Sequence, residues 1–309
     1  MESIEILGNG TYLPNQIIDN NYFNNKFSLE DEWIYKRTGI KIRYWENKKN
    51  ITQMAIEAVK NVIEKTKLDV QMIDCIIVCS TSTDKIMPGI SFEIQKEFDI
   101  KKCICMDLLA GCSGYVNAFD IARKYLALGD IKYALLVGVE KLSDYIDYDN
   151  INTSILLGDG AGATILTTSK ESKLYSKNIE SLGQYSELLT CSAKTKLYMD
   201  GKKIYKFGTT KTVDNINILL EKINLTIADI KYIVPHQSNI KILDAMCKRL
   251  GISKEKMYIN LETVGNTFCA SIPIALDEMF NKNILQPKDK IIIIGYGGGL
   301  NLGSILIEI

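Results

Sequence analysis

Three side chains suited to acyl chemistry stand where apolar segments of the chain give way to polar turns. Cys112 lies between a predicted strand (103–108) and a predicted helix (113–128). His236, the only histidine, and Asn266 each follow an apolar segment in the second half of the chain. A thiol nucleophile that works with a histidine is the combination that acyl transfer through a thioester requires. We therefore predict an enzyme that forms an acyl-cysteine.

Each of these residues also has an ordinary structural explanation when it is considered alone. A free cysteine is commonly buried as a small apolar side chain, a histidine can hydrogen-bond to a carbonyl inside a core, and an asparagine tolerates the backbone angles of a turn. Glycines at 111 and 114 let backbone approach Cys112. The amino terminus of the following helix offers unpaired N–H groups, which favour a thiolate. Three such residues at corresponding junctions favour one shared site.

The composition bounds the class of protein. The 309 residues are sufficient for one large domain or two closely packed domains. The 37 Lys and Arg equal the 37 Asp and Glu, so no global positive charge attracts nucleic acid or an anionic membrane. The amino terminus lacks a basic segment followed by an apolar run, and no stretch reaches the roughly 18 apolar residues of a membrane span. We expect a soluble cytoplasmic protein with no nucleic-acid or membrane partner.

The eight cysteines lie mostly in apolar segments, which favours buried thiols over a disulfide framework. No Cys-x-x-Cys pair is present, and one histidine leaves few ligands for a metal ion. The glycine pattern at 158–163 resembles a dinucleotide-binding fingerprint, but β-branched residues follow it where a helix would have to begin. We interpret that pattern as a tight hairpin turn, and we predict neither a metal site nor a resident cofactor.

The pattern of apolar residues predicts alternating strands and helices in the first half of the chain. The predicted helices cover 51–66, 88–98 and 113–128, and the predicted strands cover 75–79, 103–108 and 133–139. This alternation is typical of a parallel sheet that is buried on both faces.

The second half of the chain repeats the first in outline. The segment 229–234 follows a helix and enters a polar turn, as 74–78 does, and glycine-rich segments at 158–163 and 297–303 each precede an apolar strand. The repetition predicts an α/β fold of two duplicated halves. We place the nucleophilic cysteine in an amino-terminal half, 1–170, and the histidine and asparagine in a carboxyl-terminal half, 171–309.

An ordered set of motifs resembles the β-ketoacyl-acyl carrier protein synthase III family of condensing enzymes over nearly the whole length of the chain. The matching segments are 7–14, 33–40, 107–114, 157–163, 235–239, 265–267, 270–273 and 297–299. The resemblance implies a thiolase-like fold of five alternating layers, αβαβα. It also implies an acyltransferase that condenses a primer acyl thioester with malonyl-acyl carrier protein, with loss of carbon dioxide, in the initiation of fatty acid synthesis.

Other members of the thiolase superfamily fit the chain less well. Elongating synthases use two active-site histidines, a thiolase needs a second cysteine in its carboxyl-terminal glycine turn, and a hydroxymethylglutaryl-CoA synthase needs a glutamate after the strand at 75–79. Two alternatives stay open. One is a specialised relative that transfers or condenses an acyl group in a secondary-metabolite or glycan pathway, and the other is a non-catalytic partner that keeps the fold.

The resemblance implies roles for the residues that match its motifs. Cys112 attacks the primer thioester, and the backbone N–H groups of Cys112 and Gly298 hold the oxyanion. His236 and Asn266 donate hydrogen bonds to the malonyl thioester carbonyl. The substrates are carried on coenzyme A or phosphopantetheine, so no further cofactor is implied.

The resemblance also implies contacts with the substrate carriers. Trp33 and Arg37 match the residues that hold the nucleotide of coenzyme A. The second arginine that the family usually has is absent from 150–153, which favours a primer delivered on a carrier protein.

Two further expectations concern protein partners. One side of the helix that follows His236 matches the surface that docks acidic acyl carrier protein, through Lys241, Lys248 and Arg249; a solvated helix face is the alternative. Met87 matches a position that reaches across a homodimer interface and limits the acyl pocket.

Overall fold

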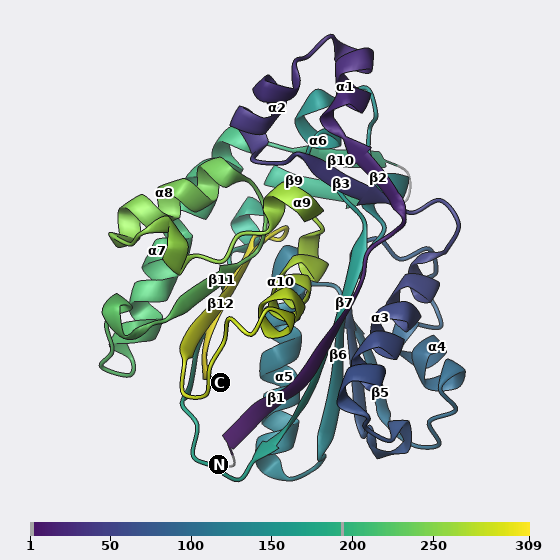
Figure 1. The fold of residues 1–309 in the computed structure, drawn as a ribbon, viewed down its shortest axis with the longest axis vertical. Coiled ribbons are helices and arrows are strands. Elements are labelled where there is room, and N and C mark those ends of the chain that lie inside the picture. Colours follow the sequence, from purple (N-terminus) through teal and green to yellow (C-terminus); the bar gives the residue numbers. More distant parts are fainter. Residues whose placement is uncertain (1–2, 193–194) are drawn as a thin grey trace.

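In the computed structural model of the protein, which describes residues 3–192 and 195–309, two β-sheets alternate with three layers of helices (Figure 1). The first sheet has the strand order β1 (Ser3–Tyr12), β7 (Gly160–Ser169), β6 (Tyr133–Glu140), β4 (Cys75–Cys79) and β5 (Ile104–Leu108). The second sheet has the order β11 (Tyr232–Pro235), β12 (Lys290–Gly297), β13 (Asn301–Glu308) and β8 (Tyr175–Ser181). Two small antiparallel pairs join β2 (Gln16–Asp19) to β3 (Ile42–Trp45), and β9 (Leu189–Ser192) to β10 (Thr195–Met199).

Helices cover both faces of each large sheet. The outer face of the first sheet carries α3 (Ile51–Thr66) and α4 (Ile90–Glu97), and the second sheet packs against α7 (Gly201–Glu221) and its neighbour α8 (Ile240–Leu250). Between the sheets lie α5 (Gly114–Leu128) and α10 (Ser271–Asn281) (Figure 1). The shorter helices are α1 (Asn20–Phe27), α2 (Asp31–Thr38), α6 (Ile151–Ser154) and α9 (Leu261–Val264). The predicted αβαβα layering is confirmed.

The two sheets share one pattern of strand directions, but neither is purely parallel. In the first sheet β4, β5 and β6 run parallel, whereas β7 is antiparallel to both β6 and β1. In the second sheet β11 and β12 run parallel, and β13 is antiparallel to β12 and β8. The expectation of a parallel sheet is wrong for β7 and β13. β13 follows β12 through a short hairpin, and β7 follows β6 through a segment with only short helical turns. Neither connection contains the long crossover helix that usually joins parallel strands.

The glycines at 158–163 do not form the expected hairpin turn. Gly160 and Gly162 lie within β7, where that strand passes close to α10. A Cβ atom on Gly162 would come within 2.8 Å of the Pro273 side chain and 2.9 Å of the Ile274 backbone nitrogen. These glycines therefore allow a strand and a helix to approach each other. A glycine hairpin does occur at 298–300, between β12 and β13.

The strands of the first sheet precede residue 170, and those of the second sheet follow it. The two sheets share the helices between them, because α5 contacts strands of both, as does α10. The division into 1–170 and 171–309 therefore stays a prediction.

The predicted elements of the first half are found within two residues of their expected ends. Among residues 3–192 and 195–309, no helix combines the length and the apolar character that crossing a bilayer requires. Residues 1 and 2, which belong to the amino-terminal segment that lacks a basic and apolar run, lie outside the described residues.

Candidate active site

Cys112 lies at the entry to α5, in a single 3₁₀ turn (Gly111–Ser113) that follows β5. Gly111 has a φ of +56°, and a Cβ there would come within 2.8 Å of the Gly298 carbonyl oxygen. A Cβ on Gly297 would come within 2.7 Å of the Cys112 sulfur. Only glycine fits at 111, where φ is positive and backbone lies close, and at 297, where a Cβ would meet the cysteine sulfur. The cysteine turn and the glycine hairpin therefore pack directly against each other.

The environment of the Cys112 sulfur contains opposing influences on its charge. Burial raises the pKa of the thiol well above its ordinary range, and the nearby Glu140 raises it further. Hydrogen bonds from the backbone N–H groups of Gly298 and Cys112 lower the pKa of the thiol but do not outweigh burial. The resting side chain is therefore a neutral thiol, and the two N–H groups are directed at the atom that reacts.

His236 follows β11 and is 2% exposed. Its Nδ1 atom lies 2.8 Å from the Ser271 hydroxyl oxygen, and its ring centroid lies 5.5 Å from that of Tyr296 in an edge-to-face arrangement. Burial lowers the pKa of the imidazole from 6.5 to about 3, although a hydrogen bond to the Phe268 carbonyl opposes this shift. The side chain is therefore neutral, and a neutral imidazole can donate from one nitrogen only.

We expect His236 to stay uncharged between pH 8 and pH 5. Its folded-state pKa is depressed, so the proton that the unfolded chain takes up near pH 6.5 is not taken up by the native protein. Because the chain has one histidine, the proton on Cε1 gives a single imidazole resonance that is followed by NMR. A titration midpoint near 6.5 in the folded protein would contradict the expected burial. The same linkage predicts that folding stability falls as the pH drops below 6.5.

Asn266 stands after Gly265, which has a φ of +77° and would bring a Cβ within 2.8 Å of the Arg43 side chain. The Asn266 Oδ1 atom accepts a hydrogen bond of 3.0 Å from the Phe268 backbone N–H. Its Nδ2 atom donates to the Ser238 carbonyl over 3.3 Å. The bond from Phe268 fixes the orientation of the amide. The Asn266 Nδ2 atom has a second hydrogen that can be donated to a substrate.

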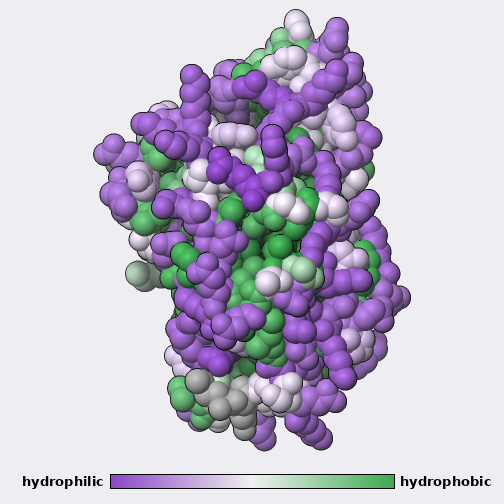
Figure 2. Space-filling model, turned by 90° about the vertical axis from the view of Figure 1, so that its left-hand side faces the viewer, coloured by the Kyte–Doolittle hydropathy of each residue, from purple (hydrophilic) through white to green (hydrophobic). Residues whose placement is uncertain are grey.

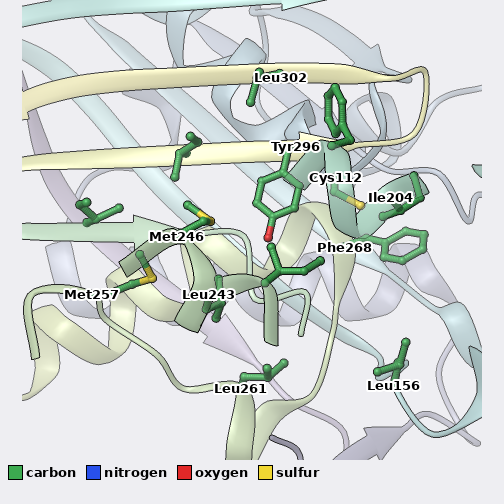
Figure 3. Packing of buried hydrophobic residues seen from close by; sticks show 14 of the residues in the cluster. Cys112, Leu156, Ile204, Leu243, Met246, Met257, Leu261, Phe268, Tyr296 and Leu302 are labelled. Atoms are coloured by element: carbon green, nitrogen blue, oxygen red, sulfur yellow. The ribbon is translucent and has the colours of Figure 1, made fainter. Parts of the chain in front are cut away.

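Cys112, His236 and Asn266 line one cavity of about 810 Å³. Cys112 also lines a second, largely apolar cavity of about 340 Å³, together with Gly298 and Phe268. The sulfur of Cys112 is directed toward Ile204 and Phe268, as Figure 3 shows. The structure therefore brings together the three predicted catalytic residues, and it places the thiol where the two cavities meet.

The residues expected to contact the nucleotide lie on α2. The Arg37 guanidinium lies 5.2 Å from the centroid of the Trp33 ring, and Arg37 lines the larger cavity. Trp33 is 41% exposed and does not line that cavity. Asn152 and Thr153, in the region where the family usually has an arginine, also line it.

The three basic residues of α8 do not share one environment. Lys241 lines the larger cavity, whereas Lys248 and Arg249 are exposed in the last turn of the helix and line neither cavity. Figure 2 shows the side of the molecule that carries α7 and α8, and most of that surface is hydrophilic. Met87 is 79% exposed and lines neither cavity of its own chain.

Glu140 is a buried carboxylate beside the site that the sequence did not single out. It accepts hydrogen bonds from the Ser82 hydroxyl at 2.6 Å, from the Thr81 backbone N–H at 3.1 Å, and from the Cys269 thiol at 3.0 Å. Burial raises the pKa of Glu140, while the bonds from Ser82, Cys269 and Thr81 lower it. Since Thr81 and Ser82 line the smaller cavity, Glu140 holds part of its wall in place.

A buried thiol at the start of a helix between two sheets, in a five-layer α/β arrangement, defines a thiolase-fold acyltransferase. The match to the family is specific. Residues 106–183 match the profile of 3-oxoacyl-[acyl-carrier-protein] synthase III, and residues 220–309 match the profile of its carboxyl-terminal region. The chain belongs to the 3-oxoacyl-[acyl-carrier-protein] synthase III family.

Individual relatives agree over the full length of the chain. The β-ketoacyl-[acyl-carrier-protein] synthase III of Clostridium novyi is 39% identical over 322 aligned positions, covering 100% of this chain and 99% of the relative. The crystal structure of the 3-oxoacyl-[acyl-carrier-protein] synthase III from Aquifex aeolicus superimposes with a TM-score of 0.96 at 33% identity, covering 99% and 100% of the two chains. A priming β-ketosynthase from a polyketide biosynthetic pathway gives a TM-score of 0.94 at 28% identity, covering 99% and 96%.

Proposed function

We propose that the protein condenses a primer acyl thioester with malonyl-acyl carrier protein, through an acyl-Cys112 intermediate, to start fatty acid synthesis. The observation that carries the proposal is the convergence of Cys112, His236 and Asn266 on one cavity. Membership of the family and the names of the relatives support the reaction. Both substrates bring their own thioesters, so the reaction requires no resident cofactor.

The first half-reaction is acyl transfer to Cys112. The sulfur attacks the carbonyl carbon of the primer, its proton leaves on the departing carrier thiol, and the charge that develops on the carbonyl oxygen is stabilised by the N–H groups of Cys112 and Gly298. The hydrogen bonds from these groups to the resting sulfur support this assignment. The apolar cavity beside Cys112 receives the acyl chain.

The second half-reaction uses the other two residues. The malonyl thioester enters the larger cavity, and loss of carbon dioxide leaves an enolate whose oxygen accepts hydrogen bonds from His236 and Asn266. The enolate carbon attacks the acyl-cysteine, and Cys112 leaves as a thiolate that takes up a proton. A neutral imidazole suits this role, because it stabilises the oxygen without transferring a proton to the carbanion.

Intact-protein mass spectrometry tests the proposed sequence of steps. Incubation with an acyl-CoA or an acyl-carrier protein should add the acyl mass to the protein, and malonyl-acyl carrier protein should then remove it as a β-ketoacyl product forms. An adduct that persists with malonyl-acyl carrier protein, and is discharged by another nucleophile, would favour the specialised acyl transfer considered as the alternative.

The mouth of the larger cavity carries a cation that the sequence did not indicate. Lys202, on the first turn of α7, lines this cavity together with Arg37 and Lys241. Among the residues that the structure describes, none of these three cations forms an ion pair with a carboxylate. Phosphate groups of a phosphopantetheine carrier satisfy such unpaired cations. We assign Lys202 the contact with a carrier phosphate that the absent second arginine would otherwise make.

We expect Lys202→Ala to raise the KM for acyl-CoA about 5- to 20-fold in the acylation of Cys112, because it removes a charge-assisted contact with a phosphate. Lys203→Ala is the matched control. Lys203 is the next residue on the same helix, but it pairs with Asp200 at 3.4 Å and does not line the cavity. The KM for an acyl-pantetheine, which has no phosphate, should not change. Equal effects of the two substitutions would contradict a specific role for Lys202.

We also propose that the protein forms a homodimer through the open edge of the first sheet. β5 is an edge strand. Exposed apolar side chains occur before, within and directly after β5 in the sequence; they are Ile86 at 98% exposed, Met87 at 79%, Phe92 at 50%, Ile104 at 38% and Leu109 at 81%. An uncovered edge strand with apolar neighbours is a surface for pairing with a second copy. Such pairing would bring Met87 to the partner. Met87 lines neither cavity of its own chain, so its side chain is free to contact the second copy.

We expect Ile104→Lys to convert the dimer to a monomer in sedimentation-velocity experiments at micromolar concentration, because a charge on the edge strand β5 opposes its pairing with a second copy. Ile218→Lys is the control, since Ile218 is 42% exposed on α7 in the other half of the chain. A wild-type protein that sediments as a monomer would contradict the proposal.

The carrier-protein surface stays a prediction for Lys248 and Arg249. Their exposure on α8, on the same helix as the cavity-lining Lys241, supports it. The cytoplasmic location expected from the composition also stays a prediction.

A further inference from the structure

The larger and the smaller cavity meet at a junction that is lined by apolar side chains. Of the residues that the structure describes, those that line both cavities are Cys112, Leu157, Leu189, Leu197 and Phe268. The two leucines at 189 and 197 belong to β9 and β10, and the other two apolar residues follow α6 and Asn266. The passage around the Cys112 sulfur is therefore bounded by large side chains from segments far apart in the sequence.

Phe268 is held firmly at this junction. It is 8% exposed, and the Cys112 sulfur is directed toward its side chain (Figure 3). The Phe268 backbone N–H donates to Asn266 Oδ1 at 3.0 Å, and the Phe268 carbonyl accepts from the Ser271 hydroxyl at 2.8 Å. The backbone of Phe268 therefore cannot withdraw from the thiol without breaking hydrogen bonds inside the site.

The backbone angle of Phe268 is unusual for a bulky residue. Its φ is +45°, in the left-handed region that side chains with a Cβ seldom adopt. A phenylalanine in this conformation costs free energy that a glycine would avoid. A strained residue beside a reactive group points to a role for its side chain in the site. At this position the side chain narrows the junction.

The junction receives one particular part of the primer. When the thioester carbonyl carbon is at the Cys112 sulfur, the carrier extends into the larger cavity and the acyl chain into the smaller one. The first carbon of the acyl chain then lies at the junction, and the end of the chain lies deeper in the smaller cavity. A branch on that first carbon must share the junction with the Phe268 ring. In a closely packed pocket one methylene changes the specificity constant by about 10- to 200-fold.

We propose that Phe268 is a specificity-determining residue that selects primers without a branch at the carbon next to the thioester carbonyl. The inference rests on the proposed function, because it requires that Cys112 accepts an acyl group. The length of the primer is limited separately, by residues that line the smaller cavity alone. Leu142 is one of these, since it is 3% exposed and does not line the junction.

The test compares two isomeric primers, butanoyl-CoA and 2-methylpropanoyl-CoA, which differ only in the branch. Intact-protein mass spectrometry gives the second-order rate constant for acylation of Cys112 by each. The wild-type protein should prefer the unbranched isomer by about 10-fold or more, and Phe268→Ala should reduce this preference to about threefold or less. Phe268→Leu should give an intermediate value. Equal rates for the two isomers in the wild-type protein, or an unchanged preference in Phe268→Ala, would overturn the proposal. The wild-type result is decisive even where the variants fold poorly.

Two further variants separate the junction from the rest of the molecule. Leu142→Ala should raise acylation by hexanoyl-CoA relative to butanoyl-CoA about 5- to 10-fold, while the preference between the two isomers stays at the wild-type value. Phe280→Ala removes a partly buried ring from α10 that lines neither cavity, and it should change neither preference. Loss of the isomer preference in Leu142→Ala or in Phe280→Ala would assign it to cavity volume or to general loosening, and would overturn the role of Phe268.

The acyl adduct and the condensation product distinguish this inference from the proposed function. If no primer modifies Cys112, the proposed function fails at its first step and the selectivity fails with it. If both isomers acylate and condense equally well, the proposed function stands and the role of Phe268 fails. If the isomers are discriminated as expected but malonyl-acyl carrier protein gives no β-ketoacyl product, the role of Phe268 stands and the proposed condensation fails.

Discussion

Cys112→Ala should abolish condensation, lowering its rate by at least about 10,000-fold, because it removes the thiol that carries the acyl intermediate. The same variant should give no acyl adduct in intact-protein mass spectrometry. Decarboxylation of malonyl-acyl carrier protein should persist, since the donors to the enolate oxygen come from His236 and Asn266. The site thus predicts a variant that consumes malonyl thioester without forming a carbon–carbon bond.

The control must separate the nucleophile from other thiols near the substrate. Cys191 is exposed and lines the smaller cavity, so it is a second thiol that an acyl thioester can reach. Cys191→Ala should keep both the adduct and the condensation. Loss of the adduct in Cys191→Ala, together with its retention in Cys112→Ala, would show that Cys191 is the nucleophile and would contradict the assignment of Cys112.

Local patterns in the sequence were sufficient to predict much of the fold. The helix at 51–66 and the strand at 75–79 were placed correctly, because the spacing of their apolar residues reflects one buried face or a fully buried strand. The antiparallel directions of β7 and β13 were missed. Strand direction depends on how the chain returns to the sheet, and the apolar content of a strand does not record it.

The three central residues of the candidate site were found because their chemistry is unusual at chain junctions. Their partners were not found, since these depend on packing between segments far apart in the sequence. Ser271 is 35 residues from His236, and Glu140 is 129 residues from the Cys269 thiol that donates to it. The difference between Lys202 and Lys203 also has no local signal, because it depends on which side of α7 faces a cavity built by other elements.

The protonation of the site illustrates the same limit. The sequence predicted that N–H groups at the start of a helix favour a thiolate at Cys112, but the degree of burial that outweighs such groups is a tertiary property. A neutral thiol and a neutral imidazole follow from that burial. The proposed mechanism therefore relies on donors directed at oxygen atoms, and it does not use a resting thiolate–imidazolium pair.

His236→Ala and Asn266→Ala should each lower malonyl decarboxylation and condensation about 100- to 1,000-fold, because each removes one donor to the enolate oxygen. Acylation of Cys112 should continue in both variants, since its oxyanion is held by backbone N–H groups that the substitutions do not touch. The double variant should lose less than the product of the two single losses, because both donors act on one oxygen and its stabilisation is not additive.

The comparison of half-reactions decides whether these residues have separate roles. Single-turnover acylation measured by mass spectrometry, and carbon dioxide release from malonyl-acyl carrier protein, report on the two steps independently. A variant at 236 that stops acylation as well would assign the imidazole to activation of the Cys112 thiol. In that case the buried, neutral thiol would need a base, and the donor role would belong to Asn266 alone. Intact acylation with lost decarboxylation would instead establish that Cys112 acts as the nucleophile without a histidine base.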